Sequence, residues 1–556
     1  MSQLSVEQIH QYVKDLGNED DDALLDLLAA VERCQMTYSL LKSTSIGKVV
    51  GKLKKSTNPK VAEIATRVVT NWKKLIPTAA HDSSKSVSNS TALTGPTKLH
   101  HESQFMDLRE FLSSRIVSPS LEEMGYFYKS IAFDGSRMRT LSPGNNSLSG
   151  PVIFLLTRDQ RLSDNWALIR SQEVAISKSS ALFIVFCLVP SFLNGNIRQR
   201  GFMLRNLKLM EHDAMKLNIP FFLLLGEPKD LLPDFLSQYK VSHIVTDFSP
   251  LRIITKWNTD IISLLQKKTE QAKIPFEQVD AHNICPSWVI SSKCEFSAKT
   301  IRTKIHNGIS SYLTEFPELL VHPHTYPGLN LTDSSNSSST RSTNKWIEAL
   351  DLMSGRPIAS GVDSSSFYDV PEITWCLPGE REAKEALKRF VARLDKYGDD
   401  RNNPVLVNGV SNLSPYIRFG HISVQRILLE IKRAFNITNK SLFPEVRTTG
   451  IHSFCEEVVV RRELSDNFCL YNVKYDSIEG AHSWAQKTLR EHWNDVRPVV
   501  YTAEQLEAAV TADDLWNAAQ LEMVSCPLRS RNALCVCVCV CDQRIRTVLG
   551  EAHDFT

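Results

Sequence analysis

The sequence has no long apolar run and almost no net charge. Its longest apolar stretch, Ala181 to Pro190, falls far short of the roughly 18 residues that a membrane span needs. The first residues lack the apolar core of a secretion signal. The 64 Lys and Arg residues balance 62 Asp and Glu residues, so any affinity for nucleic acid must come from local patches. We therefore expect a protein that is neither secreted nor inserted in a membrane.

Several catalytic motifs are also missing. The sequence contains no serine nucleophile elbow, no His-Glu-x-x-His pair and no Walker phosphate loop. Their absence is consistent with a reaction whose chemistry is carried by a bound cofactor.

The cysteines do not suggest a disulfide framework or a metal site. Seven of the twelve are scattered singly over the first 525 residues, as buried thiols are in a reducing compartment. The repeat from Cys535 to Cys541 alternates Cys with Val, and alternate residues of an extended chain point to opposite faces, which does not suit tetrahedral zinc. We predict no metal site and interpret residues 525–556 as an aberrant tail, typical of translated non-coding sequence.

The N-terminal part has a helical period. Residues 1–35 are acidic, with Leu24, Leu28 and Val31 at helical spacing, and a second apolar stripe runs from Val61 to Ile76. A Ser-, Thr- and Asn-rich stretch without apolar period follows. The pattern predicts a small helical bundle on a flexible linker.

The period changes at Val152. Apolar runs such as Val152 to Leu156 and Phe221 to Leu225 alternate with helix-length segments, which predicts a parallel, doubly wound α/β sheet. From Glu380 onward the pattern is helical. The predicted multidomain order is a helical bundle at 1–77, a linker and transitional segment at 78–149, an α/β domain at 150–282, an interdomain connection with a Ser/Asn-rich loop (Thr332 to Asn344) at 283–379, an all-α domain at 380–524 and the tail at 525–556.

Four segments resemble class II DNA photolyases. They are Gly150 to Leu168, His282 to Trp288, Glu372 to Gly379 and, most diagnostic, Phe454-Cys-Glu-Glu-Val-Val-Val-Arg-Arg-Glu-Leu-Ser-Asp-Asn-Phe468. The resemblance covers roughly residues 150 to 524 and stops at Val524. It predicts a cofactor domain that is truncated on its C-terminal side.

The resemblance implies a flavoprotein lyase that uses blue light to reverse cyclobutane pyrimidine dimers in DNA. The helical domain would hold a reduced FAD, and the α/β domain would be the antenna half, with a possible second chromophore of unknown identity. A dimer stacked in a duplex cannot touch a flavin, so the lesion must be extruded into a pocket. Ultraviolet-damaged DNA is the implied partner, and we expect a monomer that acts in the nucleus.

The segment from Lys396 to Arg401, followed by Asn408 to Gly420, resembles the flavin pyrophosphate segment of that family. A glycine-containing turn with hydroxyls ahead of a helix beginning near Pro415 is suited to an anion. The alternative is that Ser411 or Ser414 simply caps that helix. The FAD-contacting positions that the resemblance implies are Tyr397, Arg401, Ser411, Leu413, Ser414 and, further along the chain, Arg461.

The candidate catalytic residue is Glu457, preferred over its neighbour Glu456. The resemblance places the carboxyl of Glu457 against the dimer carbonyls and Arg461 near the flavin. The alternative is a surface ion pair between Glu457 and Arg461 at i,i+4, worth about 0.3 to 0.5 kcal/mol.

The segment from Tyr38 to Val50, with Leu53 to Lys55 and Thr70 to Leu75, resembles the N-terminal domain of S-II type transcription elongation factors. Such a bundle docks short disordered motifs, which implies transcription-elongation proteins as partners. Two other functions stay open at this point. One is a cryptochrome-like flavin photoreceptor, and the other is a non-enzymatic binding protein that acts through the bundle alone.

Overall fold

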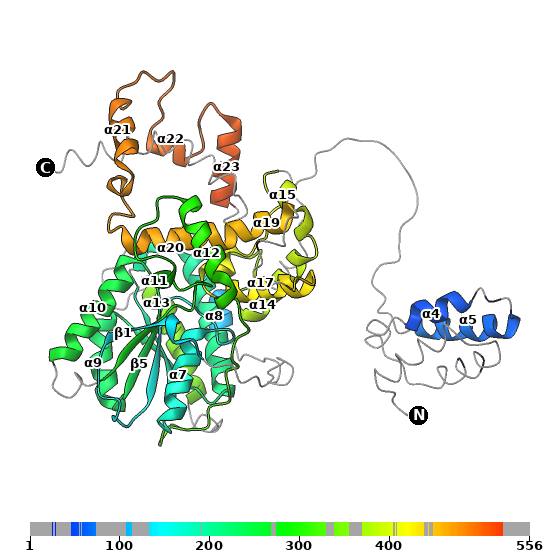
Figure 1. The fold of residues 1–556 in the computed structure, drawn as a ribbon, viewed down its shortest axis with the longest axis horizontal. Coiled ribbons are helices and arrows are strands. Elements are labelled where there is room, and N and C mark those ends of the chain that lie inside the picture. The colour runs from blue at the N-terminus through cyan, green and yellow to red at the C-terminus, as the bar shows by residue number, and fades with distance from the viewer. Residues whose placement is uncertain are drawn as a thin grey trace. The chain divides into compact units, whose positions relative to one another are not determined.

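The computed structural model divides into two compact units, Met1–Thr97 and Lys98–Thr556 (Figure 1). Apart from a few isolated positions, the residues it describes are 46–54, 58–73, 107–113, 133–190, 192–267, 274–329, 338–354, 370–403, 408–438 and 449–525. The predicted acidic helix at 1–35, the linker after residue 77 and the Cys-Val repeat lie outside these ranges. No helix in the described part is both long and apolar enough to cross a bilayer.

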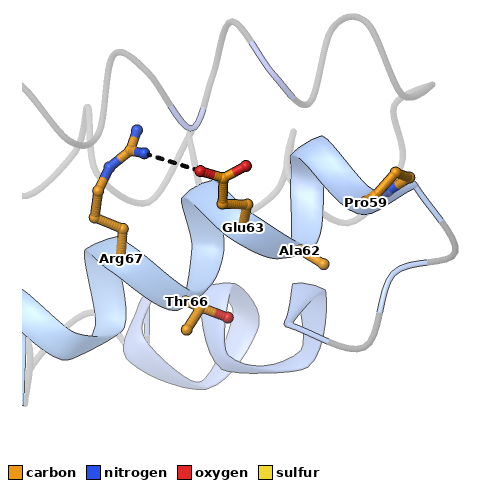
Figure 2. Close-up of a pocket in the computed structure, with 5 residues that line it drawn as sticks. All are labelled: Pro59, Ala62, Glu63, Thr66 and Arg67. Atoms are coloured by element: carbon orange, nitrogen blue, oxygen red, sulfur yellow. Dashed lines mark ion pairs between the residues drawn. The ribbon is translucent and has the colours of Figure 1, made fainter.

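The first unit contains two packed helices, α4 (Ile46–Leu53) and α5 (Pro59–Lys73). The apolar stripe predicted from Val61 onward is their shared interior, where Val61, Ala65 and Val68 are buried with Val50. The outer side of α5 carries a shallow depression in which Arg67 pairs with Glu63 at 3.8 Å (Figure 2). A helix pair with one apolar side and one charged side is what the three-to-four-residue period predicts.

The second unit is built on a six-stranded sheet with strand order β1-β6-β5-β2-β3-β4. All neighbours are parallel except β1, which runs antiparallel to β6 at one edge. The central strands are continuous apolar runs because a parallel sheet is covered on both faces. The strands are β1 (Met138–Ser142), β2 (Val152–Leu156), β3 (Leu182–Leu188), β4 (Phe221–Leu225), β5 (His243–Asp247) and β6 (Phe276–Val279).

Two of these strands were not predicted from the sequence. β1 lies in the stretch interpreted as transitional, and β6 reads Phe-Glu-Gln-Val, so neither shows an apolar run. The buried Glu277 of β6 is bound by Arg170 at 2.9 Å, and Gln278 by Arg139 at 2.8 Å. Polar side chains can occupy a strand when distant residues satisfy them.

Helices cover both faces of the sheet (Figure 1). Phe154 packs in the core with α7 and α8, whereas Phe183 packs on the other face with α9 and α10. The core on the first face continues without a break into the helical half through residues such as Phe390 and Leu428. The covering helices are α7 (Trp166–Ser177), α8 (Ile197–Lys216), α9 (Pro228–Tyr239) and α10 (Arg252–Lys267).

The remaining described elements are helical. The helix α13 begins at Ser338, inside the predicted low-complexity stretch. Its other end is buried through Trp346 and Leu350, and this burial stabilises the helix. These elements are α6 (Leu108–Ser113), α11 (Ser287–Ile290), α12 (Ala298–Tyr312), α13 (Ser338–Met353), α14 (Glu380–Val391), α15 (Tyr397–Asp400), α16 (Ser414–Arg418), α17 (Val424–Ala434), α19 (Thr449–Cys455), α20 (Arg462–Tyr471), α21 (Ser483–Glu491), α22 (Ala503–Glu507) and α23 (Asp514–Ser525), with short turns η2 (Gly135–Arg137), η3 (Phe192–Asn194), η6 (Leu394–Lys396), η7 (Glu456–Arg461) and η8 (Ile478–Gly480).

Candidate functional site

Three of the predicted site residues, Tyr397, Arg401 and Glu457, lie together where α15 packs against α19. Tyr397 begins α15 and is buried edge-on against Phe390 and Phe454. Arg401 follows α15, and its guanidinium lies 5.8 Å from the centre of the Tyr397 ring. The same guanidinium pairs with the carboxylate of Glu457 at 2.9 Å. The fold therefore brings an aromatic ring, a cation and a carboxylate into one constellation.

This constellation depends on a close backbone approach. Gly450 in α19 lies directly against η6, since a Cβ at this position would sit 2.1 Å from the carbonyl oxygen of Leu394 and 2.3 Å from that of Asp395. Glycine alone allows helices to approach so closely. Gly450 thus sets the distance between α15, which Arg401 follows, and the chain segment that carries Glu457.

The predicted pyrophosphate segment lies against the end of α15. A Cβ on Gly409 would come within 2.6 Å of the Asp400 carbonyl oxygen, and Arg393 donates to the carbonyls of Asn408 and Val410, the latter at 3.0 Å. These contacts pin the loop that leads into α16.

Neither serine of this loop caps α16. The N-cap position is Leu413, which is fully buried, and it makes no side-chain capping bond. The hydroxyl of Ser411 instead accepts a bond from the Leu413 amide at 3.3 Å, and Ser414 is the exposed first residue of the helix. The capping alternative considered for these serines is therefore not what the structure contains.

Glu457 lies on a π-helical turn, η7, which continues α19 into α20. In such a turn the backbone bonds join residues five apart, and single π turns are frequent at functional sites. Its three valines, Val458 to Val460, are buried, and the charged residues flank them. The turn thus carries two carboxylates out of an apolar core.

The ion pair between Glu457 and Arg461, considered as the alternative to a catalytic role, is not formed, because the π turn changes which residues align. Arg461 Nε pairs with Glu456 at 3.3 Å, five residues away, and Glu457 pairs with Arg401. Arg302 of α12 binds Glu456 from the other side at 3.0 Å. Arg461 is about half exposed, and the structure groups it with Glu456 rather than with Tyr397.

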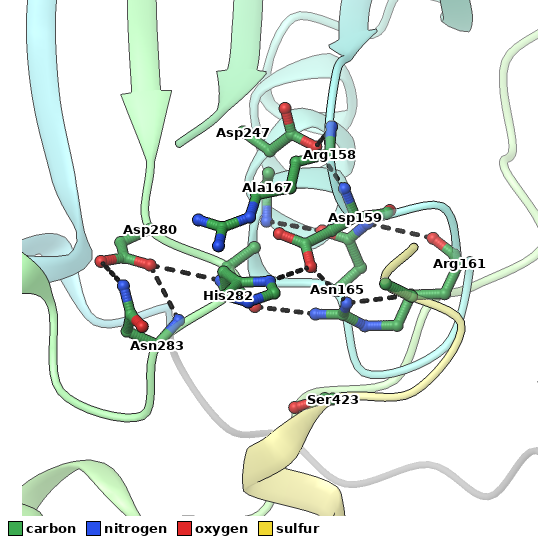
Figure 3. A network of polar contacts seen from close by, with 12 residues as sticks. Arg158, Asp159, Arg161, Asn165, Ala167, Asp247, Asp280, His282, Asn283 and Ser423 are labelled. Carbon is green, nitrogen blue, oxygen red and sulfur yellow. Dashed lines mark hydrogen bonds and ion pairs between the residues drawn. The ribbon is translucent and has the colours of Figure 1, made fainter. Parts of the chain in front are cut away.

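A second polar cluster occupies the carboxyl edge of the sheet (Figure 3). Asp247 ends β5, and its carboxylate accepts the backbone amides of Thr157, Arg158 and Asp159 at 2.8 to 3.0 Å. Burial, together with the nearby Asp159, raises the pKa of Asp247 to about 6 although these three amides favour its charged form. One side chain therefore fixes the whole turn that follows β2.

Asp159 is the centre of this cluster. Burial alone would raise its pKa, but Arg161 at 2.7 Å and His282 at 3.0 Å lower it well below the usual range. Burial and Arg158 lower the pKa of His282 to about 4. His282 is therefore neutral at physiological pH, and its Nδ1–H donates to the Asp159 carboxylate.

The cluster also joins the two halves of this unit. Arg158 forms two parallel bonds to Asp466 of α20, at 2.8 and 3.0 Å. Asn283 donates to the same carboxylate at 3.0 Å and to Asp280, which follows β6, at 3.1 Å. Residues at the carboxyl ends of three parallel strands thus hold α20, the helix that continues from η7, in place through hydrogen bonds.

Sequence reasoning assigned no role to this cluster, although the resembling segments contain several of its members. A usable signal was present. Arg158 stands just after the apolar strand β2 and Asp247 ends β5, whereas Asp280 follows β6, which shows no apolar run. Because the carboxyl ends of parallel strands meet at one edge of a sheet, charged residues at such ends are expected to lie together.

Glu463, the second residue of α20, gives a prediction about pH. Burial raises its pKa to about 7 from the usual 4.5, although Arg462 is adjacent. Within the described residues its Oε2 has no hydrogen-bond partner, and its Oε1 accepts the Ile284 amide at 2.9 Å. The folded state therefore binds this proton more tightly than the unfolded state does.

The stability that Glu463 contributes is fully present below about pH 4.5 and is lost as the pH rises through about 7. Replacing Glu463 by Gln removes the ionisation. We expect Glu463→Gln to raise the free energy of unfolding relative to the unsubstituted chain at about pH 8 and to leave it unchanged at about pH 4.5. Urea denaturation at the two pH values measures this, and an equal effect at both would contradict the prediction.

Two family models match the chain. The model described as DNA photolyase matches residues 152–322, and the model described as TFIIS helical bundle-like domain matches residues 26–76. The first covers strands β2 to β6 and the loop that holds His282, and the second covers the two packed helices of the first unit.

Similar proteins cover most of the second unit. The chain is 42% identical over 395 residues to the deoxyribodipyrimidine photo-lyase of Potorous tridactylus. The matched region covers 70% of this chain and 67% of that protein. It is 40% identical over 403 residues to the protein of the same name from Arabidopsis thaliana, or 71% of this chain and 75% of that one. The N-terminal part is 26% identical over 133 residues to the probable mediator of RNA polymerase II transcription subunit 26b of Arabidopsis thaliana, or 24% of this chain and 30% of that protein.

Proposed function

The chain belongs to the deoxyribodipyrimidine photo-lyase family, and we propose that it uses blue light to split cyclobutane pyrimidine dimers in DNA with the help of a bound, reduced FAD. The observation that carries this proposal is identity of 40 to 42% over about 400 residues, or 70 to 71% of this chain. The photoreceptor and the purely protein-binding alternatives are not favoured by these relatives.

The residues around α15 fit a flavin dinucleotide. Arg401 supplies a cation, and Ser411 and Ser414 supply hydroxyls, which are groups that bind phosphate oxygens. Tyr397 and Leu413 add buried apolar surface suited to an aromatic ring system. We therefore assign cofactor contacts to these five residues.

A bound, reduced flavin would supply the electron that opens the dimer. The chain's own contribution is to receive the extruded lesion and to stabilise the negative charge that develops on it. We assign that role to Glu457, whose carboxyl group, held by Arg401 at 2.9 Å, would contact the pyrimidine carbonyl oxygens. To Arg461 we assign a contact with DNA phosphate near the lesion, which its half-exposed side chain supports.

Repair of ultraviolet-irradiated plasmid by the full chain tests the proposal. We expect dimers to disappear under blue light after addition of FAD and a reductant, and to persist in the dark. A yellow protein that repairs nothing would favour the photoreceptor alternative. A colourless protein that binds neither FAD nor damaged DNA would favour action through the bundle alone.

We further infer that the N-terminal bundle binds transcription proteins and that the whole chain works in the nucleus. The support is the match to the TFIIS helical bundle-like domain and the depression along α5 beside Glu63 and Arg67 (Figure 2). From Lys42 to Lys74 nine Lys or Arg residues stand against Glu63 alone, and this excess of positive charge favours an acidic motif. Fluorescence titration with an acidic peptide should give tighter binding to the full chain than to its Arg67→Glu variant, and equal binding would contradict the inference.

A further inference from the structure

The ion pair between Arg158 and Asp466 is a buried polar joint between the sheet and the helical half. Its partners are 308 residues apart in the sequence, and their side chains are 16% and 9% exposed. Burial would raise the pKa of Asp466, but Arg158 lowers it well below the usual range. Both groups are therefore charged, and their parallel bonds fix direction as well as distance.

The sheet side of this joint is rigid. The backbone amide of Arg158 donates to Asp247 at 2.8 Å, and the amides on either side of it donate to the same carboxylate. Gly420 lies tightly against this turn, since a Cβ there would be 2.5 Å from the Cα of Asp159. The guanidinium of Arg158 thus projects from a turn that has little freedom to move.

On the helix side of the joint, α20 continues directly from η7, the π turn that carries Glu457 and is called the catalytic turn below. Asp466 lies in the second turn of α20, and α20 begins at the residue after η7. Arg462 Nε donates to the Val458 carbonyl at 2.9 Å, and its Nη1 donates to the side-chain oxygen of Asn283 at 3.0 Å. From Asp466 to Glu457 is nine residues, or about 14 Å of helix. A rotation of α20 about its axis would therefore move Glu457.

A π turn is a weakly stable form of helix that persists where its surroundings hold it. On the N-terminal side, Gly450 holds α19 against η6. On the C-terminal side, the joint to the sheet holds α20. We propose that Arg158 and Asp466 are positioning residues that keep Glu457 aligned with the lesion, so that the α/β domain serves repair as a structural template for the catalytic turn, independently of any light-harvesting role. This proposal rests on the proposed function of Glu457.

The test uses the full chain and removes both charges together. A single Asp466→Asn substitution would leave Arg158 buried without its anion, which is strongly destabilising. The double variant Arg158→Met with Asp466→Asn avoids that penalty and removes the ion pair, while the neutral contact between Asn283 and residue 466 stays in place. The control is Asp476→Asn, because the pair between Arg252 and Asp476 also connects α10 to the segment after α20 but is about half exposed on both sides.

The first measurement is amide hydrogen exchange of residues 456–462, which needs neither light nor flavin. We expect exchange to accelerate about tenfold in the double variant, with an unfolding midpoint close to that of the unsubstituted chain. The control should exchange normally. Unchanged exchange in the π turn of the double variant would overturn the proposal.

The second measurement is the quantum yield of dimer splitting at saturating lesion. We expect a fall of about tenfold in the double variant, because small misplacements of a reacting group are costly. In a Glu457→Ala background the same double substitution should change nothing further, since the joint acts through Glu457. An equal additional loss in that background would show a merely structural role. A wild-type chain that repairs no dimers would contradict the proposed function, whereas the exchange measurement would still decide the role of the joint.

Discussion

Replacing Glu457 by Ala is expected to lower the quantum yield of dimer splitting by about tenfold or more, equivalent to about 1.4 kcal/mol, while the affinity for damaged DNA changes little. A hydrogen bond that strengthens as negative charge develops favours the reaction more than it favours binding. In Glu457→Gln the side-chain amide supplies a hydrogen-bond donor at nearly the same place, so this variant should keep part of the quantum yield. Flash photolysis on a defined dimer, with lesion affinity measured separately, gives both quantities.

The matched control is Glu456→Gln. Glu456 lies on the same π turn, but its carboxylate is bound by Arg302 and Arg461. Burial would raise its pKa, and these two cations bring it below the usual value. A charge held in two ion pairs is poorly placed to respond to a lesion. We expect its loss to reduce the quantum yield much less than the loss of Glu457. Equal losses for the two residues, or a pure binding defect, would contradict the assignment.

The sequence could predict the sheet because its central strands, such as Val152 to Leu156, are buried on both faces and so consist of apolar residues alone. It could not predict β6, whose Glu277 and Gln278 are buried against partners from other segments. A hydrophobic pattern along the chain predicts which apolar residues are buried. It does not predict the burial of polar residues whose hydrogen-bond partners come from distant segments.

The same limit applies to the site. Resemblance indicated Tyr397, Arg401 and Glu457 singly, and the structure adds that one guanidinium contacts both of the others. Arg461 pairs with Glu456 and not with Glu457 because this segment is a π turn. The sequence Glu-Glu-Val-Val-Val-Arg has no local feature that distinguishes a π turn from an α-helix. The backbone form is set by tertiary contacts at both ends of the turn, which are the contacts that the sequence does not display.

Replacing Gly450 by Ala is expected to disrupt the site from the other end. The new methyl carbon would meet two backbone carbonyl oxygens, of Leu394 and Asp395, at 2.1 and 2.3 Å, and backbone atoms cannot rotate away as a flexible side chain can. The helix α19 must then move off η6, which carries the chain into Tyr397 and Arg401. We expect the free energy of unfolding to fall by about 1 to 3 kcal/mol, the usual range for overpacking.

The functional consequence should be a loss of FAD binding together with that stability, since Arg401 and Ser411 belong to the segment that is displaced. Denaturant unfolding and flavin absorbance of the same preparation measure the two effects. Gly135→Ala is the matched control, because nothing lies within 4 Å of a Cβ at that position and its backbone angle is ordinary. If Gly450→Ala left both stability and flavin content at the level of the Gly135→Ala control, α19 and η6 would have room between them, and the distance between Arg401 and Glu457 would have to be set by the joint at Asp466 alone.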